Sequence, residues 1–169
     1  AEPLADIIEL RVDLISQADI PRLLKATTKP CIVTNRTKTE GGQFKGSEKE
    51  RIQILQHAIE AGADYIDIEA STPKELLRSV LNSKGNTRTI LSFHNFTNTP
   101  DDLAPLYDIM CEIPADIIKI VTYAQDINDN LKVFKILNRA RKEEKKLIAL
   151  CMGEKGEISR ILSPLYGGF

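Results

Sequence analysis

The sequence predicts an α/β protein built on a parallel sheet, and three observations lead to that fold class. Six short segments rich in β-branched and other apolar residues recur along the chain. A helical pattern separates each segment from the next, and strands joined in this way pair in parallel. Polar residues gather near the carboxyl ends of several segments, which is where a (β/α)8 TIM barrel builds its active site. A barrel is therefore expected rather than a doubly wound sheet, because no Gly-x-Gly-x-x-Gly motif follows the first segment.

Two strand patterns are present. Ile7–Leu14 alternates and places Glu9, Arg11 and Asp13 on one face, which requires water or a polar pocket there. Ala115–Thr122 is instead almost continuously apolar, as in a strand buried on both faces. Strands are expected over residues 7–14, 30–35, 63–69, 89–96, 115–122 and 146–152.

The helices are marked by their ends. Ser47 and Glu50 form the sequence pattern of a capping box, and Gly62 marks the end of that helix. Pro73 stands at the start of the next helix, where a proline is tolerated. Helices are expected over residues 18–28, 47–61, 71–85, 99–112, 129–145 and 158–162.

Composition limits the classes of function. The chain has 169 residues, of which 42% are hydrophobic and 28% charged, with a net charge of −1. These values indicate one soluble domain over residues 1–169, without a nucleic-acid or membrane partner. Cys31, Cys111 and Cys151 are widely spaced, so we expect reduced thiols, no metal site and a cytoplasmic location.

The most informative single residue is Lys119, inside the apolar segment Ala115–Thr122. Burying an ammonium ion is costly, and burial favours the neutral amine, which is a nucleophile for carbonyl carbon. The alternative is a lysine at the end of a strand whose ammonium group reaches water.

His94 closes the strand pattern that precedes Lys119. Consecutive strands of a parallel barrel lie about 4.8 Å apart, so the imidazole and the amine are expected to face one substrate. Lysine would form an imine, which acidifies the adjacent C–H bond, and histidine would move the proton. The alternative for His94 is a hydrogen-bonded structural histidine. His57, in the middle of a helix, is expected on the surface.

A second set of charged residues accompanies this pair. Arg11, Arg36 and Arg160 each lie near a strand end or the start of the last helix. Arginine binds carboxylates through two parallel hydrogen bonds, so a shared rim of arginines indicates an anionic substrate. Glu9, Glu40 and Glu69 either neutralise these arginines or orient His94.

At this point the sequence resembles a known family. Its motifs follow one another in the order and spacing of the type I 3-dehydroquinate dehydratases of the shikimate pathway and cover nearly the whole chain. The matching motifs are Glu9-Leu-Arg11-Val-Asp13, Arg36-Thr-Lys-Thr-Glu40-Gly-Gly, Asp67-Ile-Glu69, Ser92-Phe-His94-Asn-Phe96, Ile118-Lys119-Ile120 and Met152-Gly-Glu-Lys-Gly156-Glu-Ile-Ser159-Arg160.

The resemblance implies a lyase that dehydrates 3-dehydroquinate to 3-dehydroshikimate, in the biosynthesis of aromatic amino acids, without metal or cofactor. In that picture Lys119 forms a Schiff base with the ketone and His94 is the general acid and base. Glu40 would hold His94 in position and Arg160 would bind the substrate carboxylate. Glu9, Arg11 and Arg36 would bind the ring hydroxyls and hold the rim of the site together. Met152 would form an apolar wall.

The chain also departs from the family pattern. It starts at Ala1 and stops at Gly167-Gly168-Phe169, whereas a barrel typically has about 250 residues. We therefore expect a domain truncated at both ends, with six of the eight βα units and weak or no activity alone.

The resemblance leaves the wider context open. A homodimer and a fusion with shikimate dehydrogenase are both expected possibilities, with a plastid location if the source is a plant. The alternatives to a dehydratase are a class I Schiff-base aldolase and a non-catalytic fragment.

Overall fold

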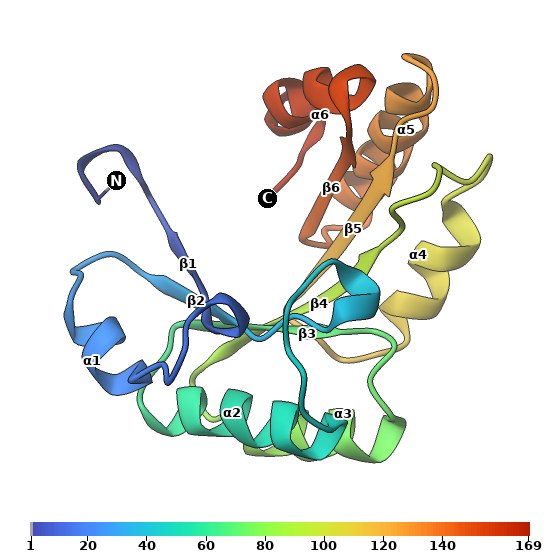
Figure 1. Ribbon diagram of the computed structural model, residues 1–169. Helices are drawn as coiled ribbons and strands as arrows, with labels where there is room; N and C mark the ends of the chain where they lie inside the picture. Colours follow the sequence, from blue (N-terminus) through green and yellow to red (C-terminus); the bar gives the residue numbers. More distant parts are fainter. Residues whose placement is uncertain (1) are drawn as a thin grey trace. The chain divides into compact units, whose positions relative to one another are not determined.

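The computed structural model describes residues 2–169, and its strands and helices alternate along the chain (Figure 1). Six strands follow one another in the sheet in chain order, and the pairings β1–β2, β2–β3 and β5–β6 are parallel. The strands are β1 (Ile8–Arg11), β2 (Cys31–Thr34), β3 (Tyr65–Glu69), β4 (Arg88–His94), β5 (Ile117–Tyr123) and β6 (Leu147–Met152). This βα alternation is that of a TIM barrel, with six units present, as the sequence predicts.

Six α-helices separate or follow the strands. They are α1 (Ile20–Lys25), α2 (Glu48–Glu60), α3 (Lys74–Ser83), α4 (Ala104–Cys111), α5 (Asp129–Lys142) and α6 (Glu157–Leu162). Short 3-10 turns complete the connections: η1 (Glu2–Leu4), η2 (Val12–Leu14), η3 (Lys38–Glu40), η4 (Glu154–Gly156) and η5 (Ser163–Tyr166). Within residues 2–169, none of the helices combines the length and the apolar character needed to cross a bilayer.

The chain divides into two compact units, Ala1–Ile90 and Leu91–Phe169, with the boundary inside β4. In the first unit, Glu9 lies opposite Ile32, and Thr34 lies opposite both Arg11 and Asp67. Residues paired in parallel strands point to the same side, so one face of β1–β3 carries the charged residues. The other face is the apolar core under the helices, with Val33, Ile66 and Ile68 fully buried.

The second unit has the same two-sided arrangement. Lys119 lies opposite Ile148 and Tyr123 opposite Met152, so these four residues share one face of β5 and β6. The opposite face packs against α5. Its buried residues and their helix partners are Ile118, Ile120, Leu147, Ala149, Cys151, Val133, Leu137 and Ala140.

The predicted helix signals are confirmed at α2. The Ser47 hydroxyl accepts a hydrogen bond from the Glu50 backbone N–H, and the Glu50 carboxylate accepts from the Ser47 backbone N–H at 2.7 Å. Gly62, just after the helix, has φ of 86°, a conformation that glycine adopts without strain. All three cysteines are thiols rather than disulfides, as predicted.

Three of the predicted boundaries that were wrong have a visible cause, in each case a side chain that bonds elsewhere. The first strand ends at Arg11 instead of Leu14, because Asp13 turns back to pair with Arg11. The fourth strand ends at His94, since the Asn95 side chain accepts hydrogen bonds from two backbone N–H groups of the following turn. Helix α4 begins at Ala104 rather than near Thr99, whose hydroxyl bonds to β5.

Candidate active site

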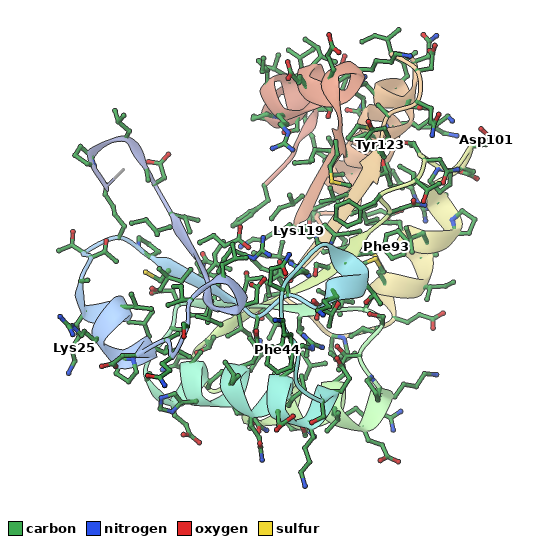
Figure 2. The ribbon with its side chains drawn as sticks, in the orientation of Figure 1. Lys25, Phe44, Phe93, Asp101, Lys119 and Tyr123 are labelled. Atoms are coloured by element: carbon green, nitrogen blue, oxygen red, sulfur yellow. The ribbon has the colours of Figure 1, made fainter. Side chains whose placement is uncertain are left out.

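Lys119 is the third of the seven residues of β5, so it lies within the strand and not at its end (Figure 2). It is half-buried, between fully or nearly fully buried Ile118 and Ile120 that point to the opposite face. The neighbouring positions on its own face, Ile148 and Met152 of β6, are half-buried as well. Lys119 therefore lies on the face of β5 and β6 that is opposite to the one packed against α5.

A backbone hydrogen bond just after β4 shows where His94, the last residue of that strand, lies against β5. The Asn95 N–H donates to the Val121 carbonyl oxygen at 2.8 Å, which sets His94 beside Val121 on β5. Val121 is two residues beyond Lys119, so His94 and Lys119 are on the same face of neighbouring strands. Strand spacing and rise put their Cα atoms about 8 Å apart.

Met152 and Arg160 come from the last strand and helix. Met152 ends β6 on the face of Lys119, and Arg160 lies exposed in α6. The Ser159 hydroxyl, fully buried, donates to the Gly156 carbonyl oxygen at 2.6 Å and accepts from the Cys151 N–H at 2.8 Å. These two bonds attach the start of α6 to the end of β6.

In the first unit, Glu9 and Arg11 are each engaged by a neighbour. The Thr34 hydroxyl donates to Glu9 Oε1 at 2.6 Å, and Arg11 forms two hydrogen bonds with Asp13, at 2.9 and 2.7 Å. Burial acts to raise the pKa of Asp13, but the Arg11 bonds and backbone N–H donors, including that of Gln43, lower it overall. Asp13 therefore fixes the direction of the Arg11 guanidinium.

Arg36 is the centre of a buried cluster of carboxylates. Its guanidinium lies 2.8 Å from Asp67, 3.3 Å from Glu69 and 4.0 Å from Glu40. Burial alone would lower the pKa of Arg36, but the three carboxylates raise it. Glu40 also accepts a hydrogen bond from the Ser71 hydroxyl at 2.9 Å. The expectation that glutamates neutralise an arginine of the rim is confirmed for Arg36.

One charged residue of this region was missed by the sequence reasoning. Arg51 of α2 is fully buried and forms an ion pair with Glu69. The available signal was its spacing: Arg51, Leu55 and Ala58 recur on the buried stripe of the helix. Among residues 2–169, no group of three or more His, Cys, Asp or Glu side chains is arranged to hold a metal ion.

The chain is similar to known proteins along its whole length. The family model of type I 3-dehydroquinase matches residues 1–169. The chain belongs to the type I 3-dehydroquinase family. Among curated members of this family, 3-dehydroquinate dehydratase from Dehalococcoides mccartyi is 41% identical over 96% of this chain and 72% of its own length. The predicted resemblance and the enzyme class, a 3-dehydroquinate dehydratase, are thereby confirmed.

Some relatives are larger. The bifunctional 3-dehydroquinate dehydratase/shikimate dehydrogenase of Arabidopsis thaliana, a chloroplastic protein, is 40% identical over 98% of this chain, which spans only 28% of it. Fusions with shikimate dehydrogenase therefore occur in this family.

Solved structures show the same fold. The type I 3-dehydroquinate dehydratase from Clostridium difficile, solved with covalent modified comenic acid, has a TM-score of 0.88 at 26% identity. That match covers 98% of this chain and 72% of the other. The roles predicted for individual site residues stay predictions.

Proposed function

We propose that this chain dehydrates 3-dehydroquinate to 3-dehydroshikimate through a Schiff base on Lys119. The observation that carries the proposal is the pairing of Lys119 with His94. A lysine within a strand and a histidine on the same face of the preceding, neighbouring strand are the minimum that imine chemistry requires. The C. difficile relative was solved with covalent modified comenic acid, which is consistent with covalent chemistry in that protein.

In the proposed reaction the Lys119 amine adds to the substrate ketone and water leaves, which gives a protonated imine. The imine withdraws electrons from the neighbouring carbon, so its C–H bond becomes acidic. His94 takes that proton and then gives a proton to the departing hydroxyl, which leaves as water with the former C–H electron pair forming the C=C bond. Hydrolysis of the imine returns the ketone and the free amine.

The remaining predicted residues would bind and orient the substrate. A carboxylate is best held by a guanidinium, and Arg160 is the exposed arginine of α6. Glu40 would orient His94, because a carboxylate that accepts from one ring N–H fixes the tautomer and the ring direction. The proposed binding residues are Glu9, Arg11 and Arg36 for hydroxyl groups, Arg160 for the carboxylate and Met152 for the apolar side of the ring.

Trapping with borohydride tests this proposal. Reduction in the presence of 3-dehydroquinate should convert the imine to a stable amine and raise the mass of the protein by one bound ligand. Lys119→Ala should abolish the adduct, whereas Lys135→Ala, on the exposed side of α5, should not. An adduct that persists in Lys119→Ala would refute Lys119 as the nucleophile. A phosphorylated sugar that forms the adduct when 3-dehydroquinate does not would instead favour an aldolase.

The molecular context of the reaction is also proposed. We infer either a homodimer or a fusion with shikimate dehydrogenase, the latter because two relatives carry both activities in their names. The native mass of the protein in an extract of its source, detected with an antibody to this chain, distinguishes the two. A cytoplasmic or plastid location is a prediction that fractionation of the same extract tests.

A further inference from the structure

Arg51 has an environment that arginine rarely occupies. It is 0% exposed, although it lies in the first turn of α2, and its guanidinium makes several polar contacts. Its neighbours are the two carboxylate oxygens of Glu48 at 2.9 and 3.0 Å, the Thr72 hydroxyl at 2.6 Å, the Asn35 carbonyl oxygen at 3.5 Å and the carboxylate of Glu69. Arg51 and Glu69 form a buried ion pair, and removing either residue would leave the other as an uncompensated buried charge.

Glu69 connects Arg51 to the predicted site. Its Oε2 faces the Arg51 guanidinium, whereas its Oε1 lies 3.3 Å from Arg36 and accepts from the Thr37 N–H at 3.1 Å. Glu69 is the last residue of β3 and is 1% exposed. One carboxylate therefore joins helix α2 to the segment that follows β2.

That segment carries two of the predicted site residues, Arg36 and Glu40. Its main chain bonds to the Arg51–Glu69 ion pair at two points. The Thr37 N–H donates to Glu69, and the Asn35 carbonyl oxygen accepts from Arg51. Without the Arg51 cation, Glu69 would have to bind a proton or turn towards water, because a buried carboxylate with too little positive charge is costly. Either change weakens its bonds to Thr37 and Arg36.

We propose that Arg51 is a positioning residue that, through Glu69, fixes the place of Arg36 and Glu40. It reaches the substrate only through other residues, so it is not a catalytic residue. The expected effect of Arg51 on turnover rests on the proposed function. The claim that Arg51 fixes the place of Arg36 and Glu40 does not.

Hydrogen exchange of the Thr37–Gly42 backbone tests the positional claim directly. Arg51→Gln and Glu69→Gln keep the approximate size of each side chain and remove its charge. Both should speed exchange in this segment. Glu48→Gln is the matched control, since it removes a carboxylate from the same guanidinium on the side that is 38% exposed, away from Arg36. Its exchange in Thr37–Gly42 should equal that of the parent.

Two outcomes would overturn the inference. One is unchanged exchange in both Arg51→Gln and Glu69→Gln. The other is an equal increase of the Thr37–Gly42 exchange rate in Glu48→Gln, which would mean that any charge change in α2 loosens the segment. If Arg51→Gln does not fold, Glu69→Gln carries the exchange test alone, because it removes the charge at the other end of the same ion pair. Arg51→Lys is the conservative variant, because lysine keeps the cation beside Glu69 but loses the paired hydrogen bonds to Glu48.

Turnover supplies the second readout. A displacement of about 1 Å in a site costs on the order of a hundredfold in rate, so Arg51→Gln should lower kcat by up to that factor. Arg51→Lys should recover part of the loss and Glu48→Gln should stay near the parent. If the parent traps no borohydride adduct, the proposed function fails while the exchange result stands. If the parent forms the adduct and Arg51→Gln keeps the parent's kcat, the positioning role is wrong.

Discussion

Gly42 offers a sharp test of how closely the segment after β2 must be packed. It is buried, and a Cβ atom built on it would lie 2.0 Å from the carbonyl oxygen of Arg36 and 2.4 Å from its carbonyl carbon. The Gly42 N–H donates to the Thr37 carbonyl oxygen at 2.7 Å, so the chain folds back on itself here. The need for glycine is therefore a close approach of main chain to main chain.

The size of the effect follows from these distances. Contacts of a real Cβ below 3.0 Å are essentially never observed, so Gly42→Ala must move the Arg36 main chain, or its own, by at least about 1 Å. The Arg36 side chain and Glu40 move with that segment. A misplacement of about 1 Å costs on the order of a hundredfold in rate, and we expect kcat/KM to fall by about that factor.

The assay follows formation of the conjugated product from 3-dehydroquinate, together with a thermal melt of each variant. Gly62→Ala is the control. Gly62 has φ of 86°, which strains any other residue, but nothing lies within 4 Å of an added Cβ, so the substitution causes no clash. That variant should lose about 1–2 kcal/mol of stability through strain and keep its kcat/KM. A folded Gly42→Ala variant with kcat/KM within twofold of the parent would refute the reasoning.

Two further predictions concern stability. Asp13 has a lowered pKa, so its bond to Arg11 stabilises the protein above the unfolded pKa of 3.8, and this contribution is lost as the pH falls through the lower folded pKa. Asp13→Asn should therefore lower the melting temperature at pH 7 and have little effect near pH 2; an equal loss at both would contradict this. Ser47→Ala removes the N-cap of α2 and should cost about 1 kcal/mol in a denaturant titration, whereas Ser83→Ala, near the end of α3, should cost less. Equal losses would show that the capping box contributes nothing special.

Local signals in the sequence predicted most of the secondary structure. The capping box at Ser47, the glycine at position 62 and the six apolar segments act within a few residues of chain, and each is confirmed. The errors came at ends where a side chain bonds to a distant or turned-back partner. Thr99 looked like the start of a helix, but its hydroxyl bonds to Thr122 on β5, which no local pattern encodes.

The candidate site was also only partly predictable from the sequence. Lys119 could be singled out from the sequence, because a lysine is conspicuous in an apolar strand, and its chemistry with His94 stays a prediction. Their shared face depends on the register of β4 and β5, which the backbone hydrogen bond between Asn95 and Val121, 26 positions apart, reveals. The sequence also showed Arg36 and Glu69 as charged residues without saying which pairs form.

By itself, then, the sequence determined the alternation of strands and helices, the family and the residue types available for chemistry. These depend on periodicity, caps and motifs that are contiguous along the chain. Only the tertiary structure decided that Arg36 is neutralised by three carboxylates and that Arg51 is buried against Glu69. The physical reason is that charge pairing in a low-dielectric interior depends on distances of a few ångströms between residues far apart in sequence.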